Sequence, residues 1–395
     1  MSLLLTVLAF ATIPASLPSV LDMGIPCPST SARGISMGES GFVELTPTGA
    51  LRNPALSGLL GPGLLVEVSG GTRLTMEKRL RKVYDEFGSS IGESEEAFNR
   101  HISTFPGGVS ATGSGAVGIP NNVSITAGLY RPYSFCYDYD RMVMDESYVE
   151  TARERLEVSG RASELALAAC FAPSERLLVG LGAGYLFGNR TSRWVVSYVD
   201  PTADDVLQVT DTDVSGASAR ASALYRAGRV AISAGMDYSL SYELTGDEQA
   251  SVSLPPVFHA GAVYEPGNAL RTVFTGECYY SARSDAEREG ADMYDRDAWG
   301  MSAGVENDLP GGPVGRFGFS YRSSPISRAL DRMAFTLGLG FRLGDYSLDV
   351  GGSFSPGRWR QVEVPDMVSF DPGDSLVVEE SSTTVLLSIG RRFEL

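Results

Sequence analysis

Apolar and polar side chains alternate with a period of two along most of the chain. One clear case is residues 335–343, where one face carries Phe335, Leu337, Leu339, Phe341 and Leu343. The opposite face carries Thr336, Gly338, Gly340 and Arg342. Successive side chains of a strand point to opposite sides, so this pattern predicts a β-strand with one apolar face.

The same alternation predicts strands throughout the chain. They lie near residues 64–74, 123–139, 158–171, 176–188, 216–226, 229–244, 256–265, 269–283, 297–306, 313–322, 333–343, 345–356 and 384–394. The chain direction requires one return strand between residues 75 and 122, which the pattern does not place. Because single-chain bacterial barrels have even strand numbers, we expect about fourteen strands in total.

The connections between these strands alternate in length. Short turns are expected at residues 173–175, 227–228, 266–268, 309–313 and 344, and longer polar loops near 189–215, 245–254, 284–296, 323–332 and 357–382. Alternation alone also fits a soluble sandwich, but aromatics near the ends of the apolar faces, such as Tyr185, Phe187, Tyr346 and Phe354, favour lipid–water boundaries. We therefore predict an all-β fold in which residues 63–395 form a closed antiparallel transmembrane barrel in a bacterial outer membrane.

The first residues have the character of a secretory signal. Residues 1–15 combine a short apolar run with small residues, and we expect them to be a signal peptide. A lipid anchor at Cys27 is the alternative. After residue 15, no run approaches the roughly 20 apolar residues of a membrane-spanning helix.

Composition and motifs argue against several functions. The formal net charge is −16 and the pI is about 4.7, so nucleic acid is not an expected partner. The four cysteines are far apart and there are only two histidines, so we expect no metal, no cofactor and no disulfide framework. Lipase, zinc-protease and phosphate-loop motifs are missing from the sequence, and we expect no catalytic residues and no enzyme activity.

Several polar residues are expected to face the barrel lumen. His259, Asp237, Asp349 and Arg342 stand opposite the apolar faces of their predicted strands. The other histidine, His101, is expected in a loop. Dense carboxylates in the loops near 200–213 and 285–297 are interpreted as a solvated outer surface, with cation bridging to lipopolysaccharide as the alternative.

A motif near the N-terminus resembles a known family. It consists of Arg33, Gly34, Met37, Gly38 and Gly41, followed by Asn53, Pro54 and Ala55. This pattern is similar to the FadL-like superfamily of outer-membrane proteins, which includes fatty-acid and aromatic-hydrocarbon channels and the PorV-type barrels of a secretion system. The resemblance implies a barrel of about fourteen strands, with residues 16–62 folded inward as a plug that contains these motif residues.

Three functions follow from these expectations. The favoured one is passive uptake of a hydrophobic small molecule, such as a fatty acid, that passes sideways into the bilayer. The predicted lumen faces have few bulky apolar residues, but Phe42, Leu45 and Leu51 of the plug could supply an apolar pocket. The second is a secretion-associated scaffold that binds protein partners through aromatics such as Trp194, Tyr198 and Trp359. The third is a structural porin. In each case the surroundings are outer-membrane lipid and lipopolysaccharide.

Overall fold

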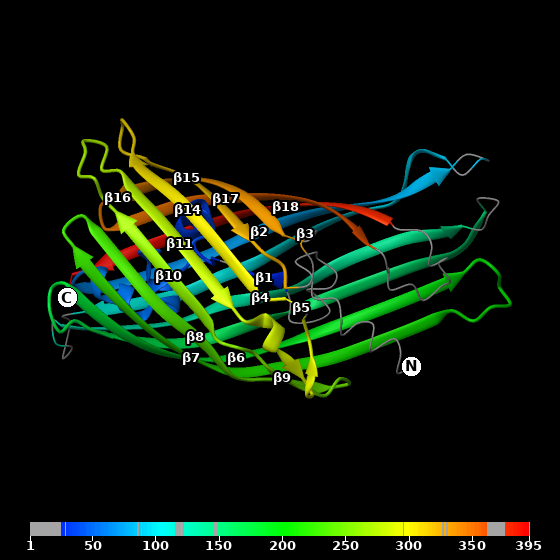
Figure 1. The fold of residues 1–395 in the computed structure, drawn as a ribbon, viewed down its shortest axis with the longest axis horizontal. Helices are drawn as coiled ribbons and strands as arrows, with labels where there is room; N and C mark the ends of the chain where they lie inside the picture. The colour runs from blue at the N-terminus through cyan, green and yellow to red at the C-terminus, as the bar shows by residue number, and fades with distance from the viewer. Residues whose placement is uncertain are drawn as a thin grey trace.

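A single closed sheet dominates the computed structural model. The structure describes residues 25–394, except 28, 85–86, 88, 115–119, 121, 145–148, 295, 326–327, 329–330 and 362–375. In this part of the chain the sheet has 18 strands, of which four are short and fourteen form the wall (Figure 1). The expected signal peptide lies outside the described residues.

The wall strands follow one another in chain order, and each pairs antiparallel with its neighbours. They are β2 (Gly63–Tyr84), β3 (Ser90–Ser114), β4 (Val123–Met144), β5 (Glu150–Phe171), β6 (Leu177–Tyr198), β7 (Val206–Ala227), β8 (Val230–Gly246), β10 (Val257–Tyr264), β11 (Val273–Ser281), β14 (Ala298–Asp308), β15 (Val314–Arg322), β16 (Arg332–Leu343), β17 (Tyr346–Gln361) and β18 (Leu376–Phe393). β18 pairs with β2 from Phe393–Leu64 to Val377–Leu80 and closes the barrel. The predicted closed antiparallel barrel is confirmed.

The outer surface carries an apolar belt. Leu165, Leu181 and Leu337 are 58%, 65% and 68% exposed, although each lies in a fully paired strand. Leucines that are this exposed on the outside of a closed barrel form an apolar surface, and contact with lipid is favourable for such a surface. Among the described residues, no helix is long and apolar enough to span a membrane. The barrel and its belt form the architecture of outer-membrane proteins, which confirms the predicted location.

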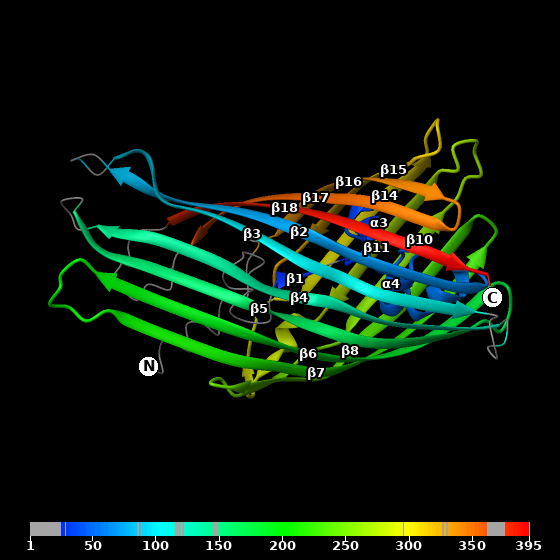
Figure 2. The ribbon, with the colours of Figure 1, turned by 180° about the vertical axis from the view of Figure 1, so that it is seen from behind.

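Several strands are longer than predicted. The expected loop at 189–215 is wrong, because β6 continues to Tyr198 and β7 begins at Val206. The loops expected at 245–254, 284–296 and 357–382 also contain strand residues. These are the end of β8, the short strands β9 (Ala250–Ser253), β12 (Glu287–Arg288) and β13 (Ala291–Asp292), and the ends of β17 and β18. Figure 2 shows β3 to β7 reaching far beyond the shorter strands on the other side of the barrel.

The unplaced return strand is β3. β2 and β3 pair along most of their lengths, with register shifts at Ser69/Gly70, Arg79/Leu80 and Val83/Tyr84. Each shift inserts an unpaired residue, so it interrupts the period-two pattern that marks a strand. His101, expected in a loop, lies within β3.

The segment between residue 29 and β2 lies inside the barrel, near the end that carries the C-terminus (Figure 1). It contains helix α3 (Ala32–Ser36), helix α4 (Pro47–Arg52) and a 3₁₀ helix, η1 (Pro54–Leu59). α3 packs on β15 to β18, α4 on β2 to β5, and η1 on β4 to β7. The segment therefore touches opposite sides of the wall, and residues 29–60 are called the inner segment below.

Candidate functional site

The inner segment owes its local shape to its own side chains. At the start of α3, the Ser31 hydroxyl accepts a hydrogen bond from the backbone N–H of Arg33. At the start of α4, the Thr46 hydroxyl accepts from the N–H of Gly49, and Pro47 occupies the first turn. Hydroxyl caps and an early proline are the usual signals that begin a helix.

The first half of the predicted plug motif contacts the wall on the β14 to β17 side. Arg33 forms an ion pair of 3.0 Å with Glu306 and donates to the carbonyl of Leu45. Gly34 packs against Glu44 so closely that a Cβ there would lie 2.1 Å from a carboxylate oxygen. Gly38 has a φ of +82° and touches backbone carbonyls of the wall. Met37 and Gly41 are buried beside it.

The second half of the motif contacts the opposite side. The Asn53 side chain is fully buried and donates to the carbonyl of Phe42 at 2.8 Å. Pro54 begins η1 and packs on Gly180 of β6. The Ala55 N–H donates to the Ser222 hydroxyl of β7 at 2.9 Å. The two halves of the motif thus contact opposite sides of the wall, and their role as a plug stays a prediction.

The four predicted lumen residues divide into two groups. Asp237 of β8 and His259 of β10 lie 3.6 Å apart on the inner wall. Asp349 instead forms a 2.5 Å ion pair with Arg316. Arg342 lines a small cavity of about 110 Å³, together with Arg33 and Asp349.

Asp237 and His259 border a larger cavity of about 400 Å³. The ring of Phe42, from the inner segment, stacks on His259 with 4.9 Å between centroids and packs on Gly235 and Gly261. Its backbone N–H donates to the Glu277 carboxylate at 2.9 Å. The cavity therefore has an apolar ring from the inner segment on one side and wall strands around it.

Sequence reasoning missed a polar network that borders this cavity and joins three wall strands. Arg220 of β7 forms an ion pair of 2.6 Å with Glu164 of β5 and donates to the Tyr130 hydroxyl of β4 at 3.0 Å. Tyr130 in turn donates to Glu164 at 2.8 Å. Each lies on the polar side of an alternating strand, so their lumenal position was predictable in principle, although their mutual contact was not.

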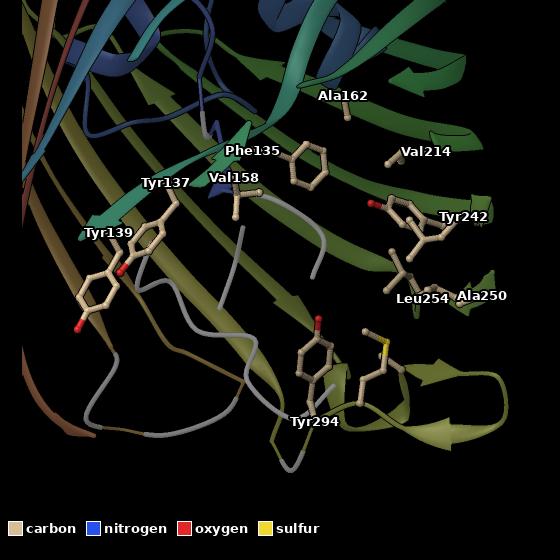
Figure 3. Close-up of a cluster of buried hydrophobic side chains, with 14 residues drawn as sticks. Phe135, Tyr137, Tyr139, Val158, Ala162, Val214, Tyr242, Ala250, Leu254 and Tyr294 are labelled. Atoms are coloured by element: carbon tan, nitrogen blue, oxygen red, sulfur yellow. The ribbon is translucent and has the colours of Figure 1, made fainter. Parts of the chain in front are cut away.

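A buried apolar cluster lies in the long half of the barrel. It includes Phe135, Tyr137, Val158, Tyr242 and Leu254, with Met293 and Tyr294 from the connection between β11 and β14. Figure 3 shows Phe135, Tyr242 and Tyr294 turned toward one interior space, with Tyr137 and Tyr139 to one side of them. Leu254, Tyr242 and Tyr294 also line the large cavity, so the two are continuous. The expectation that the lumen has few bulky apolar residues is therefore wrong for this half.

The wall has an interruption beside the cavity. The ladder between β3 and β4 covers only Gly108–Tyr130 to Ser114–Ser124 of their described residues. Where this ladder ends, Gly107 of β3 has no partner in the β2–β3 ladder. Arg131 and Pro132 of β4 have none in the β4–β5 ladder. Proline lacks the N–H that a ladder needs, and bulges bend a strand away from its partner. This interruption, residues 90–107 facing 131–144, is called the ladder break below.

Other groups occupy the ladder break. Strand β1 (Ile25–Pro26) pairs with Ser134 and Tyr133, and the Cys27 N–H donates to the carbonyl of Pro132 at 2.8 Å. The Asn99 side chain accepts from the Asp140 N–H at 3.1 Å, and His101 contacts the Cys136 sulfur at 2.7 Å. Side-chain contacts, rather than a continuous ladder, thus join β3 to β4 here, and β1 pairs with the β4 side alone among the described strands. Pro132 and Tyr133 also line the large cavity.

Comparison with known proteins identifies the fold. No protein-family model matches the sequence, and neither does any curated protein. Among solved structures, a FadL homologue of Pseudomonas aeruginosa is similar with a TM-score of 0.65 and 14% identity, covering 94% of this chain and 100% of the other. The toluene transporter TodX of P. putida has a TM-score of 0.63 and 12% identity, covering 93% and 100%.

A third solved structure agrees with these two. The toluene transporter TbuX of Ralstonia pickettii has a TM-score of 0.60 and 13% identity, covering 93% of this chain and 99% of the other. Likeness at such low identity shows the fold. The barrel fold of about fourteen strands that the resemblance implied is thereby confirmed.

Proposed function

We propose that this protein is a passive channel for hydrophobic small molecules, such as fatty acids, across the outer membrane. The observation that carries the proposal is the position of the 400 Å³ cavity. It lies between the apolar cluster of the long strands, the inner segment and the ladder break. A molecule could collect on the aromatic cluster, move into the cavity and leave sideways between β3 and β4.

The chemistry of the cavity suits this role. Pockets for small apolar ligands are largely apolar, with a few placed polar groups that set orientation. Phe42, Tyr133, Leu186 and Leu254 supply apolar walls, while Arg220 and Asp237 supply charge. The similar solved structures from P. putida and R. pickettii are named as toluene transporters, which supports transport rather than catalysis.

The alternative functions have less support. Trp194 and Trp359, candidate contact residues for a scaffold, lie in β6 and β17 rather than at loop tips. The Trp194 indole donates to Glu154 of the neighbouring strand. A porin needs an open lumen, whereas the inner segment crosses this one. We therefore keep uptake as the proposal and the scaffold as the second candidate.

Cross-linking the ladder break tests the uptake route. His101→Cys would place a thiol near Cys136 in a background where Cys27, Cys170 and Cys278 are alanine. Dibromobimane, a short thiol cross-linker, should then join β3 to β4. We expect cross-linked cells to take up radiolabelled naphthalene and oleate much more slowly than untreated cells.

Two controls isolate the effect. The same background with His101 retained should react at Cys136 alone and keep its uptake. A Ser302→Cys/Ser320→Cys pair joins two residues that already face each other in the β14–β15 ladder, and its cross-link should also leave uptake unchanged. Unchanged uptake after cross-linking of the ladder break would contradict a sideways route.

A further inference from the structure

The large cavity is lined by buried hydrogen-bonding groups that no atom of the described residues satisfies. Arg220 is only 9% exposed, and its Nη2 serves both Glu164 and Tyr130, while its Nη1 has no hydrogen-bond partner among the described residues. Nδ1 of His259 is likewise buried without a partner there. A buried polar group without a partner is costly, so such groups point to something that the site binds.

The positions of these groups define one subsite. Arg220 and Asp237 are direct partners across β7 and β8, and Asp237 lies between Arg220 at 3.7 Å and His259 at 3.6 Å. The three side chains come from consecutive wall strands and line the same cavity. Arg220 and His259 thus flank Asp237 at one place in the cavity, where a bound ligand would meet both side chains.

The charge around Arg220 limits what that ligand can be. Arg220 already faces two carboxylates, Glu164 at 2.6 Å and Asp237 at 3.7 Å, and the charge of Arg52, which lines the same cavity, also acts on Asp237. Two arginines thus face two carboxylates, so an anion would find no surplus positive charge to offset the cost of leaving water. Arg220 Nη1 can only donate, so the matching group is a neutral oxygen that accepts.

Aromatic rings also border the subsite. The Phe42 ring lies nearly parallel to the His259 ring, at 15°, and Tyr279 lies 6.1 Å from His259. Stacked and tilted rings at these separations also favour aromatic ligands. The volume of about 400 Å³ accommodates a compact ring system.

We propose that this cavity selects neutral aromatic molecules that carry a hydroxyl group, such as phenols and aryl alcohols, because a hydroxyl can accept from Arg220 and donate to Nδ1 of His259. It favours them over the parent hydrocarbon and over the corresponding carboxylate, with Arg220 and His259 as the residues that set the preference. The inference rests on the proposed function, because it assigns the cargo of the same cavity.

Three ligands of one ring size test the preference. Naphthalene, 1-naphthol and 1-naphthoate are measured by equilibrium dialysis against the full chain held in amphipol, near neutral pH. Arg220→Lys keeps the charge opposite Glu164 but has fewer donors. We expect it to weaken 1-naphthol binding by about tenfold, the value of one hydrogen bond to a charged group, and naphthalene binding by less than about twofold.

Further variants make the result specific. His259→Phe retains a ring to stack on Phe42 and should show the same selective loss of 1-naphthol binding. This variant tests the preference independently if Arg220→Lys does not fold. Arg193→Lys changes an exposed arginine on the outer face of β6, and should alter neither affinity. In the unmodified protein, 1-naphthoate should bind more weakly than 1-naphthol.

The outcomes distinguish failure of the proposed selectivity from failure of the proposed uptake function. Equal losses for naphthalene and 1-naphthol would overturn the selectivity and leave the uptake proposal standing. Tightest binding by 1-naphthoate would overturn it in favour of an anion site. If none of the three ligands binds the unmodified protein, the cavity is not a site for small aromatic ligands and the inference is overturned, while oleate uptake still decides the function separately.

Discussion

Arg391 shows how one residue can depart from the pattern of its strand without harm. It stands on the outward face of β18, where its neighbours Ile389 and Phe393 are apolar. Its guanidinium lies 4.8 Å from the Tyr346 ring and 4.5 Å from the Phe393 ring. A charge over aromatic faces is favourable, and long cationic side chains can extend from the belt to the lipid–water boundary. Arg391 therefore lies at the edge of the apolar belt, and its charge does not disrupt the strand.

Gly38 holds the inner segment against the wall. Its φ of +82° is strained for any residue with a Cβ, and such a Cβ would lie 2.6 Å from the Phe319 carbonyl and 2.7 Å from that of Ala303. We predict that Gly38→Ala weakens attachment of the segment by about 1–3 kcal/mol. Faster hydrogen exchange of amides 29–60 would show it. Gly276→Ala, whose Cβ would meet only the Ser302 carbonyl at 4.0 Å, should leave exchange unchanged.

Glu44 makes the attachment of the inner segment depend on pH. Burial raises its pKa above the ordinary 4.5, although hydrogen bonds from Ser31 and Thr46 and the charge of Arg33 oppose the shift. For an acid with a raised pKa, the stabilisation is complete below the unfolded value and is lost as pH rises through the native pKa. We therefore predict weaker protection of amides 29–60, corrected for intrinsic exchange, as pH rises above about 4.5.

The Glu44→Gln variant provides the control for this prediction. The amide keeps hydrogen-bonding capacity beside Ser29 and Thr46 but cannot ionise. Protection of the inner segment should then be nearly independent of pH over the same range. A pH dependence that survives in Glu44→Gln would assign the effect to another group, and the buried carboxylate of Glu67, which accepts from Thr48, would be examined next.

At the scale of elements, strands were predictable where the belt surrounds the barrel and not where they extend beyond it. In the belt, Leu165 and Leu167 of β5 point outward and the inner face is small or polar. Farther along the same strand, Arg153 and Arg155 point outward while Leu156 and Val158 point inward. The alternation continues but its polarity reverses, because water surrounds the outer face and the apolar cluster fills the inner one. A reading that expects apolar residues on the outer face throughout left this stretch of β5 outside the predicted strand.

The candidate site was predictable only in part for a related reason. Alternation puts Asp237 and His259 on the inner face, and the motif draws attention to Asn53 and Pro54. The ladder break depends instead on bulges next to Pro106 and Pro132, whose partners are set by register across separate hairpins. The contact between Arg220 and Glu164 joins β7 to β5, and no local pattern encodes it.

The extension of β6 and β7 is predicted to be dispensable for assembly. Arg193 and Val209 face each other across this hairpin, beyond the belt residues of both strands. Replacing 193–209 with Asn-Gly, which favours a tight hairpin turn, leaves the belt intact. We expect roughly the wild-type fraction to fold, judged by heat-modifiable migration on gels, with a lower unfolding temperature because buried Val196 is lost. Loss of the folded band would mean that the extension guides assembly.

At the scale of the whole molecule, strand number and the inner segment belong together. Barrels of about eight strands are filled by their own side chains, whereas barrels of about sixteen leave an aqueous channel. A wall of fourteen strands lies between these, and its inner face carries small polar residues such as Thr126, Ser222, Thr336 and Ser388. These side chains alone do not fill the lumen. The hydrogen bonds from Ala32, Gly38 and Ala55 to wall hydroxyls then explain why the lumen is polar although the cargo we propose is not.

Removing the inner segment should therefore convert the protein into an open pore. We predict that replacing residues 29–60 with a short Gly-Ser linker raises single-channel conductance in a planar bilayer on the order of tenfold, toward that of a water-filled barrel. The hairpin-shortened variant keeps the inner segment and should conduct no better than the unmodified protein. High conductance of the unmodified chain would instead favour the porin. If conductance rises without the inner segment while naphthalene uptake stays the same, the hydrophobic cargo uses the ladder break and the inner segment serves only to keep water and ions out.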